Sequence, residues 1–204
     1  MQTKEIPAAE LEQEIIEFLQ TMATKAGGKR TKPGCNLIHG KSCVLGTCVD
    51  NIPRVTPVDC YCDGTLTIWI ASEPGSGKIA NIRQNPQVAV TVFDTVDHSV
   101  EQKFIQVWGT AELINPENNA ALFNEKMEAF GLNEALSGVV EEVAERGELP
   151  VEKVEETVHN LTGSMNIIKI SPQKIRLLRM GPGAMPEIKF WENGRATTRV
   201  TGGF

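Results

Sequence analysis

The segment 54–86 constrains the fold most, because it alternates short strand patterns with turn signals and leaves room for only a short helix. Residues 55–58 have the pattern expected at the start of a strand. Asp63-Gly64 predicts a two-residue hairpin turn, and the β-branched, aromatic and apolar run 65–71 predicts a second, antiparallel strand. A glycine-containing loop then leads to a helix of about two turns, which an Asn-Pro pair ends.

The start of this expected helix is a candidate phosphate site. A helix start offers free backbone N–H groups and a positive partial charge. Ser76 and Lys78 can add a hydroxyl and an ammonium group there, and the planar guanidinium of Arg54 suits two phosphate oxygens. The alternative is that Gly75 and Gly77 only make a tight loop and that both cations are solvated surface charges.

Two specific nucleotide-binding motifs fit this segment less well. Residues 75–80 match the short dinucleotide fingerprint G-x-G-x-x-A, but the helix they open is too short to connect parallel strands. The surrounding chain also repeats short strands and hairpins instead of alternating strands with long helices. The P-loop pattern fails because Ser72 stands where its first glycine belongs and Ile79 follows the lysine.

Five short motifs follow one another along the chain: CVLGT at 43–47, PRVTPV at 53–58, GSGKIANI at 75–82, NPQVAV at 85–90 and WGTAEL at 108–113. In order and spacing they resemble the pyridoxamine 5'-phosphate oxidase-like superfamily of FMN-binding split β-barrels, well over residues 11–113 and loosely over 167–178. The resemblance implies a mainly β fold with helices (α+β), in which a split β-barrel carries an amino-terminal helix and a helical insertion.

The resemblance also implies a cofactor site. Arg54 and Lys78 would hold the FMN phosphate together with Ser76, beside Gly77. The backbone of Val55, Thr56 and Pro57 would run along the isoalloxazine ring, and Ile70 and Ala71 would line the cofactor. Gln106 is a further candidate, since a flavin-contacting glutamine of the family aligns near it. Members form homodimers with cofactor sites at the interface, so Trp191 is the candidate for a residue that reaches the partner's site.

One departure from the vitamin oxidase itself concerns the substrate. That enzyme has a phosphate-binding lysine five residues after the arginine, where this chain has Asp59, and its basic Arg-x-His element is absent, since Met180 and Gly181 follow Arg179. A carboxylate repels a phosphorylated substrate. We therefore expect an FMN-dependent oxidoreductase for another small molecule, without an assigned catalytic residue. Alternatives on the same fold are a non-catalytic flavin-binding or electron-transfer protein, or a member that binds haem, with His39 as axial ligand, or F420.

The 204 residues, 41% of them hydrophobic, predict a single domain spanning 1–204, with more chain than a split barrel needs. The extra part is a helical insertion over 115–160, which we interpret as packed on the barrel, and a carboxyl-terminal tail covers 181–204. The spacing of apolar residues over 11–22 predicts an amphipathic helix that covers the barrel instead of a signal peptide. We expect a cytoplasmic protein without a membrane span.

The five cysteines fall within 35–62 and raise the possibility of a metal or redox centre. No C-x-x-C pair occurs, and an odd number of cysteines disfavours a disulfide framework, so we expect reduced thiols and no metal. The net charge of −6 disfavours nucleic acid as a partner, despite a short basic stretch at 26–33. The histidines His39, His98 and His159 have no acidic or nucleophilic neighbour at a useful spacing.

Overall fold

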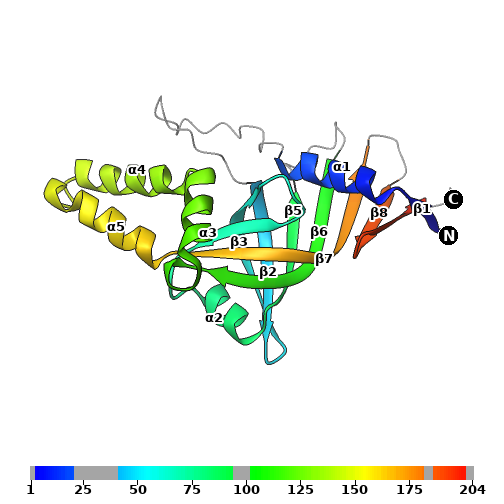
Figure 1. Cartoon of the computed structure of the whole chain (residues 1–204), viewed down its shortest axis with the longest axis horizontal. Coiled ribbons are helices and arrows are strands. Elements are labelled where there is room, and N and C mark those ends of the chain that lie inside the picture. Colours follow the sequence, from blue (N-terminus) through cyan, green and yellow to red (C-terminus); the bar gives the residue numbers. More distant parts are fainter. Residues whose placement is uncertain (1–2, 21–40, 94–101, 182–185, 201–204) are drawn as a thin grey trace.

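The computed structural model describes residues 3–20, 41–93, 102–181 and 186–200 (Figure 1). In chain order, its elements are β1 (Thr3–Ile6), α1 (Ala8–Gln20), β2 (Lys41–Val49), β3 (Ile52–Cys62), β4 (Ile68–Ser72), α2 (Gly77–Gln84), β5 (Gln87–Phe93), β6 (Gln102–Ile114), α3 (Pro116–Ala129), α4 (Leu132–Glu145), the 3-10 helix η1 (Val151–Lys153), α5 (Val154–Ser164), β7 (Asn166–Met180), β8 (Glu187–Glu192) and β9 (Arg195–Val200). Within the described residues, no helix has the length and apolar character that a membrane crossing requires.

Strands β2 to β7 close an antiparallel ring in the order β7-β4-β3-β2-β5-β6, with β6 pairing back to β7. β7 pairs with β6 along its whole length, but its other edge is shared. Residues 166–170 pair with β4, and residues 174–179 pair with β8. From there β8, β9 and β1 extend the sheet away from the ring. This arrangement confirms the predicted mainly β fold with helices, organised as a split β-barrel.

The barrel interior is filled by alternate apolar residues of its strands, and α1 closes one side of it. Leu11, Ile15 and Phe18 of α1 are buried in the same cluster as Leu45 and Ile105 of the barrel. Their spacing of three and four places them on one face of the helix. The predicted amphipathic helix over the barrel is therefore confirmed, and it begins at Ala8.

The predicted two-residue hairpin at Asp63-Gly64 is wrong. Cys62 pairs with Ile68, so a loop of five residues, 63–67, joins β3 to β4. The Asp63 carboxylate accepts hydrogen bonds from Thr65 Oγ1 at 2.8 Å and from Trp69 Nε1 at 2.9 Å. An aspartate that bonds the residue two positions on stabilises a wider turn than a two-residue hairpin allows.

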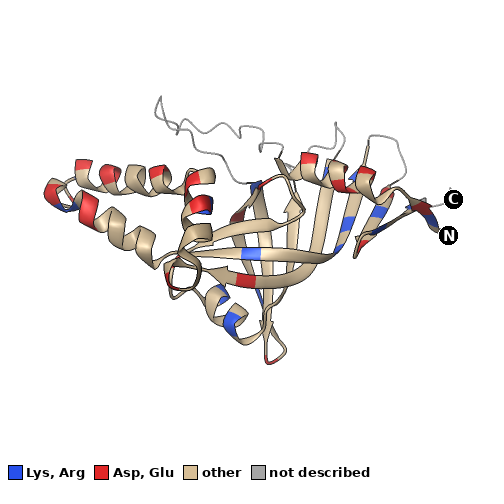
Figure 2. Ribbon diagram, viewed as in Figure 1, with Lys and Arg blue, Asp and Glu red and all other residues tan. Residues whose placement is uncertain are grey.

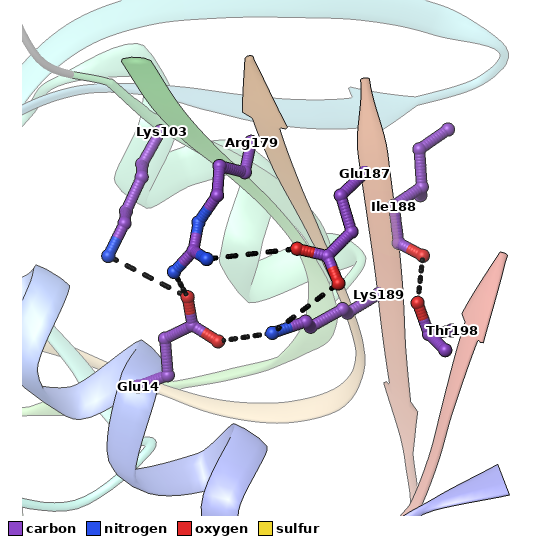
Figure 3. Close-up of polar contacts among 7 residues, drawn as sticks. All are labelled: Glu14, Lys103, Arg179, Glu187, Ile188, Lys189 and Thr198. Carbon is purple, nitrogen blue, oxygen red and sulfur yellow. Dashed lines mark hydrogen bonds and ion pairs between the residues drawn. The ribbon is translucent and has the colours of Figure 1, made fainter. Parts of the chain in front are cut away.

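Residues 187–200, within the expected carboxyl-terminal tail, form the antiparallel pair β8 and β9. A half-buried ionic cluster fastens α1 to this part of the sheet (Figure 3). Glu14 accepts hydrogen bonds from Arg179 and from Lys189, the latter at 2.8 Å, and Lys103 lies 3.6 Å away. Glu187 of β8 approaches both Arg179 and Lys189 at 3.8 Å. One carboxylate of α1 thus joins three strands.

The helical insertion is confirmed, but only part of it packs on the barrel. Phe123 and Met127 of α3 are buried against Trp69 and Ile167 of the sheet, while α4 reaches this cluster through its first turns. Lys126 is 7% exposed; its Nζ lies 2.9 Å from Asp63 Oδ2 and 4.6 Å from the Trp69 ring centroid. The rest of α4 and all of α5 project away from the barrel (Figure 1).

Replacing Glu14 with glutamine is expected to lower the free energy of unfolding at neutral pH by about 1–3 kcal/mol, because the cations of β6, β7 and β8 lose their shared anion. Burial alone would raise the pKa of Glu14, but the Lys189 hydrogen bond and the nearby cations lower it below its ordinary 4.5. A lowered pKa stabilises the fold above the unfolded-state value, and this contribution is lost as the pH falls through the folded-state value.

Urea unfolding at pH 7 and near pH 3 measures the free energies of unfolding of wild type and Glu14→Gln. The exposed Glu128→Gln variant is the control. The difference between wild type and Glu14→Gln should shrink as the pH is lowered, because the stabilisation by the Glu14 carboxylate is lost as the carboxylate takes up a proton. A difference that is the same at both pH values would contradict the assignment.

Replacing Lys126 with methionine is expected to lower the free energy of unfolding by about 1–3 kcal/mol, because the part-buried Asp63 carboxylate loses its cation. Lys153→Met, on the exposed η1, is the matched control and should change stability by no more than about 0.5 kcal/mol. Urea titration of both variants measures the difference, and equal effects would show that the Lys126 contacts do not hold α3 to the barrel.

Candidate functional site

β3 presents a bare strand edge next to α2. Residues 52–60 of β3 pair with β2 on one side, whereas β4 pairs only with Tyr61 and Cys62 on the other. Within the described chain, the second edge of β3 from Ile52 to Cys60 therefore carries no neighbouring strand. Its N–H and C=O groups are free to address a ligand, apart from the missing N–H groups of Pro53 and Pro57.

α2 begins at this edge. Gly75 turns the chain with a φ of 74°, and Ser76 then stands in extended conformation before the first helical residue, Gly77. The Ser76 side chain does not cap the helix; its hydroxyl lies 3.1 Å from that of Ser72. The first N–H groups of a helix have no intrahelical acceptor. The helix start therefore offers free backbone donors next to the residue that carries the Ser76 hydroxyl.

Polar contacts fix α2 against β2. Asn81 Nδ2 donates to Thr47 Oγ1 at 3.0 Å, and Asn85 Nδ2 donates to the Cys48 carbonyl at 2.9 Å. Thr47 is in turn the register partner of Arg54 on β3. Gly77 at the helix start and Arg54, which are 23 positions apart in the sequence, are therefore held by the same strand pair.

The guanidinium of Arg54 occupies the space where a side chain at Gly77 would be. A Cβ built on Gly77 would lie 2.6 Å from Arg54 Cζ and 3.1 Å from Nη2. Among the described residues, neither Arg54 nor Lys78 has a carboxylate within ion-pair distance. Two cations without an anion thus meet at a helix start, which is the arrangement that binds phosphate groups.

A pocket of about 280 Å³ lies beside this helix start. Its lining combines Lys78 with the β3 residues Pro57, Asp59 and Tyr61 and with Ala71 of β4; the remaining lining residues are Val58, Ser72, Glu73 and Met165. Burial, with a smaller contribution from Asp59, raises the pKa of Tyr61 to about 12. The phenol is therefore neutral at physiological pH and can donate a hydrogen bond.

The helical insertion borders this pocket. Met165, which follows α5, lines it directly. Phe130, which follows α3, stacks on Tyr61 with ring centroids 4.9 Å apart and an interplanar angle of 20°. The insertion therefore supports the pocket from behind through Phe130, and Met165, which follows the insertion, lines the pocket.

A second, apolar groove of about 360 Å³ lies on the barrel's outer surface and also includes Arg54. Val55 and Trp108 line it, and they are 69% and 40% exposed. Ile52, at the start of β3, is 70% exposed. Large apolar side chains exposed next to a polar site are typical of an interaction surface.

The structure brings most of the predicted site residues together. Arg54, Ser76, Gly77 and Lys78 meet at the start of α2, and Pro57 and Ala71 line the adjoining pocket. Thr56 lies between them on β3, half-buried, and Val55 points into the apolar groove.

Three predicted residues lie elsewhere in this chain. The Ile70 side chain is fully buried in the barrel core. Gln106, on β6, accepts a 3.5 Å hydrogen bond from Arg176. Trp191 is buried beneath α1 and donates to Glu12 Oε1 at 2.6 Å. Sequence reasoning missed Tyr61 and Met165. Tyr61 follows Pro57 and Asp59 with the period of two that places strand residues on one face, whereas Met165 carries no such signal.

The cysteines Cys43, Cys48, Cys60 and Cys62 are free thiols. A hydrogen bond with Cys60, together with burial, raises the pKa of Cys43, so that thiol stays protonated. No three His, Cys, Asp or Glu side chains come close enough to hold a metal in the described ranges. Cys35, His39 and His98 lie outside the described residues, and His159 is exposed on α5.

Solved structures with similar folds include PhzG from Burkholderia lata 383 in complex with tetrahydrophenazine-1-carboxylic acid, with a TM-score of 0.51 and 10% identity over 78% of this chain and 81% of that one. A pyridoxamine 5'-phosphate oxidase-related, FMN binding protein from Nostoc punctiforme has a TM-score of 0.49 and 12% identity over 80% and 87% of the two chains. General Stress Protein 26 from Bacillus anthracis has a TM-score of 0.45 and 17% identity over 81% and 92%.

No curated protein matches the chain. The family model described as pyridoxamine 5'-phosphate oxidase matches residues 37–178, a stretch that contains the barrel strands β2 to β6, most of β7, the helix start at Gly77 and the insertion. Since this match spans well over half of the chain, the protein belongs to the pyridoxamine 5'-phosphate oxidase family.

Proposed function

We propose that this protein is an FMN-binding oxidoreductase that acts on a small molecule, as a cytoplasmic homodimer with its cofactor sites at the interface. The observation that carries the proposal is the position of the Arg54 guanidinium against Gly77, at the start of α2 and near Lys78. A phosphate monoester placed there would meet two cations, the Ser76 hydroxyl and the free N–H groups of the helix start.

The bare edge of β3 supports a role in holding the ring of the cofactor. The backbone from Val55 to Pro57 can address the polar edge of a flavin, while Pro57 and Ala71 offer an apolar wall in the adjoining pocket. FMN, when bound, supplies the ring that accepts and returns electrons. The protein's part is to anchor the phosphate, orient the ring and limit the access of water.

The exposed apolar residues beside Arg54 support a second copy as the partner. Ile52, Val55 and Trp108 would be buried by a neighbouring molecule, and Arg54 lines the same groove as the last two. A site that opens onto such a surface becomes complete when the surface is covered. The free thiols of β2 and β3 support a reducing compartment.

The charge of the pocket lining bears on the substrate. Asp59 and Glu73 both line the pocket, and the only cation of that lining is Lys78, which the cofactor phosphate would use. A second phosphate would face two carboxylates without a cation to compensate. The proposed substrate is therefore a small molecule that carries no phosphate.

The first experiment is an absorbance spectrum of the purified protein, followed by mass identification of any small molecule released on denaturation. Flavin bands with FMN released support the proposal. A colourless protein that also fails to bind added FMN would overturn it. Anaerobic mixing of the FMN-loaded protein with reduced nicotinamide, and then with an acceptor, separates an enzyme from a protein that only stores or carries flavin.

Arg54→Ala and Lys78→Ala are each expected to weaken FMN binding by about 1.5–3 kcal/mol, because each removes a charge-assisted hydrogen bond to the phosphate. Quenching of flavin fluorescence measures the affinity. Riboflavin, which has no phosphate, should bind wild type and variants equally and serves as the control ligand. Unchanged FMN affinity in both variants would contradict the phosphate assignment.

Gly77→Ala is expected to weaken FMN binding about tenfold, because the added Cβ would push the Arg54 guanidinium away from the helix start. Stability should be unchanged or higher by up to about 1 kcal/mol, since alanine favours a helix over glycine. Gly138→Ala, in α4, where a Cβ meets nothing within 4 Å, is the control and should leave FMN affinity unaltered. A loss of affinity accompanied by unfolding would not support the steric explanation.

A further inference from the structure

Residues 132–164, which comprise α4, η1 and α5, form an arm that projects from the barrel (Figure 1). Only the first turns of α4 pack against the cluster at the barrel, through Leu132 and Leu136. α5 contains no buried residue. Val140 of α4 is also buried, but helices of 11 and 14 residues are marginal without tertiary contacts, so the arm relies on few buried apolar side chains.

The arm carries the net charge of the protein. It contains eight glutamates against Arg146 and Lys153, a net charge of −6, and the whole chain also has a net charge of −6. The remaining residues therefore balance to zero. Figure 2 shows the acidic positions along α4 and α5. Charge concentrated in this way attracts cations over a longer range than direct contact.

A groove of about 1170 Å³ lies between α4 and α5. Its apolar lining consists of Ala144 from α4 and Val154 and Val158 from α5, together with Val151 of η1, which is 76% exposed. Glutamates from both sides surround these residues: Glu141, Glu145, Glu152, Glu155 and Glu156. The rest of the lining is polar and consists of Asn133, Ser137, His159 and Thr162. The groove thus combines an apolar patch with five glutamates.

We propose that this groove is the docking site for a basic amphipathic helix of a partner protein. A third helix would bury the half-exposed valines of α5 and complete a three-helix bundle with α4 and α5. Lysine or arginine beside its apolar stripe would lie next to the glutamates, which gives the charge complementarity. Two arms of the same sequence would instead bring glutamates against glutamates, which disfavours pairing of the arm with itself.

The probe is a synthetic peptide of about 18 leucine and lysine residues, with leucines at the i, i+3, i+4 and i+7 spacing of an amphipathic helix. A peptide of the same composition with the leucines dispersed is its control. Fluorescence anisotropy with the full-length protein measures both. The patterned peptide is expected to bind at least about tenfold more tightly, because only it presents a continuous apolar stripe to the apolar patch of the groove. Equal binding, or no binding, would overturn the proposal.

A matched pair of variants separates the groove from general charge attraction. The triple change Glu152→Gln, Glu155→Gln and Glu156→Gln alters the groove lining. Glu134→Gln, Glu142→Gln and Glu148→Gln removes the same charge from arm positions outside the groove lining. The first set is expected to weaken binding of the patterned peptide about tenfold and the second set less than about threefold. Equal losses would mean that only the total charge matters.

Sedimentation equilibrium of a Val154→Ser variant tests a second copy of the chain as the occupant. An oligomeric mass equal to that of the wild type is expected, because the proposed occupant is another protein. A lower mass would show that the groove is filled by a second copy and would overturn the proposal. Circular dichroism of all variants verifies that the helices of the arm persist.

Discussion

The change of partner along β7 is the constraint on which the site depends. The first part of this strand of 15 residues pairs with β4 and a later part pairs with β8, while β6 pairs with its other edge throughout. Because β4 is short, it reaches only the last residues of β3, and the rest of that β3 edge stays bare. The β6 pairing also needs Gly109, where a Cβ would lie 3.0 Å from the carbonyl carbon of Ser171. The unpaired edge of β3 beside Arg54 therefore follows from the way in which β7 divides its pairing between β4 and β8.

Local patterns predicted the elements that depend on local interactions. The apolar spacing in α1, the Asn-Pro stop after α2 and the β-branched and apolar run of β4 each concern neighbours in sequence, and the structure has all three elements. The turn at Asp63 shows where this reasoning ends, since the same residues permit a short or a wide turn. The wide turn is selected by hydrogen bonds that Asp63 accepts from the Trp69 indole and from Lys126. A local sequence pattern does not show these contacts.

The residues of the candidate site could be predicted where they belong to motifs whose order and spacing along the chain resemble those of the family. Arg54 and Gly77 come from separate motifs, and their contact could be expected only from the resemblance, because it depends on how α2 is fixed to β2. Trp191 is a different case. Its indole is held by Glu12 of α1, a contact between the two ends of the chain. Tertiary pairing over such separations leaves no trace in hydrophobic periodicity.

α3 connects the pocket beside α2 with the arm that carries the groove between α4 and α5. Phe130, at its end, stacks on Tyr61 of the pocket, and Lys126 binds the loop that precedes β4. Gly131, which follows Phe130, has a φ of 63° and turns the chain into the arm. The residues that back the pocket are thus the same residues that set the direction of α4. Since this junction is packed and partly ionic, it fixes the position of the arm relative to the pocket. A partner held by the arm would therefore lie at a defined place with respect to the start of α2.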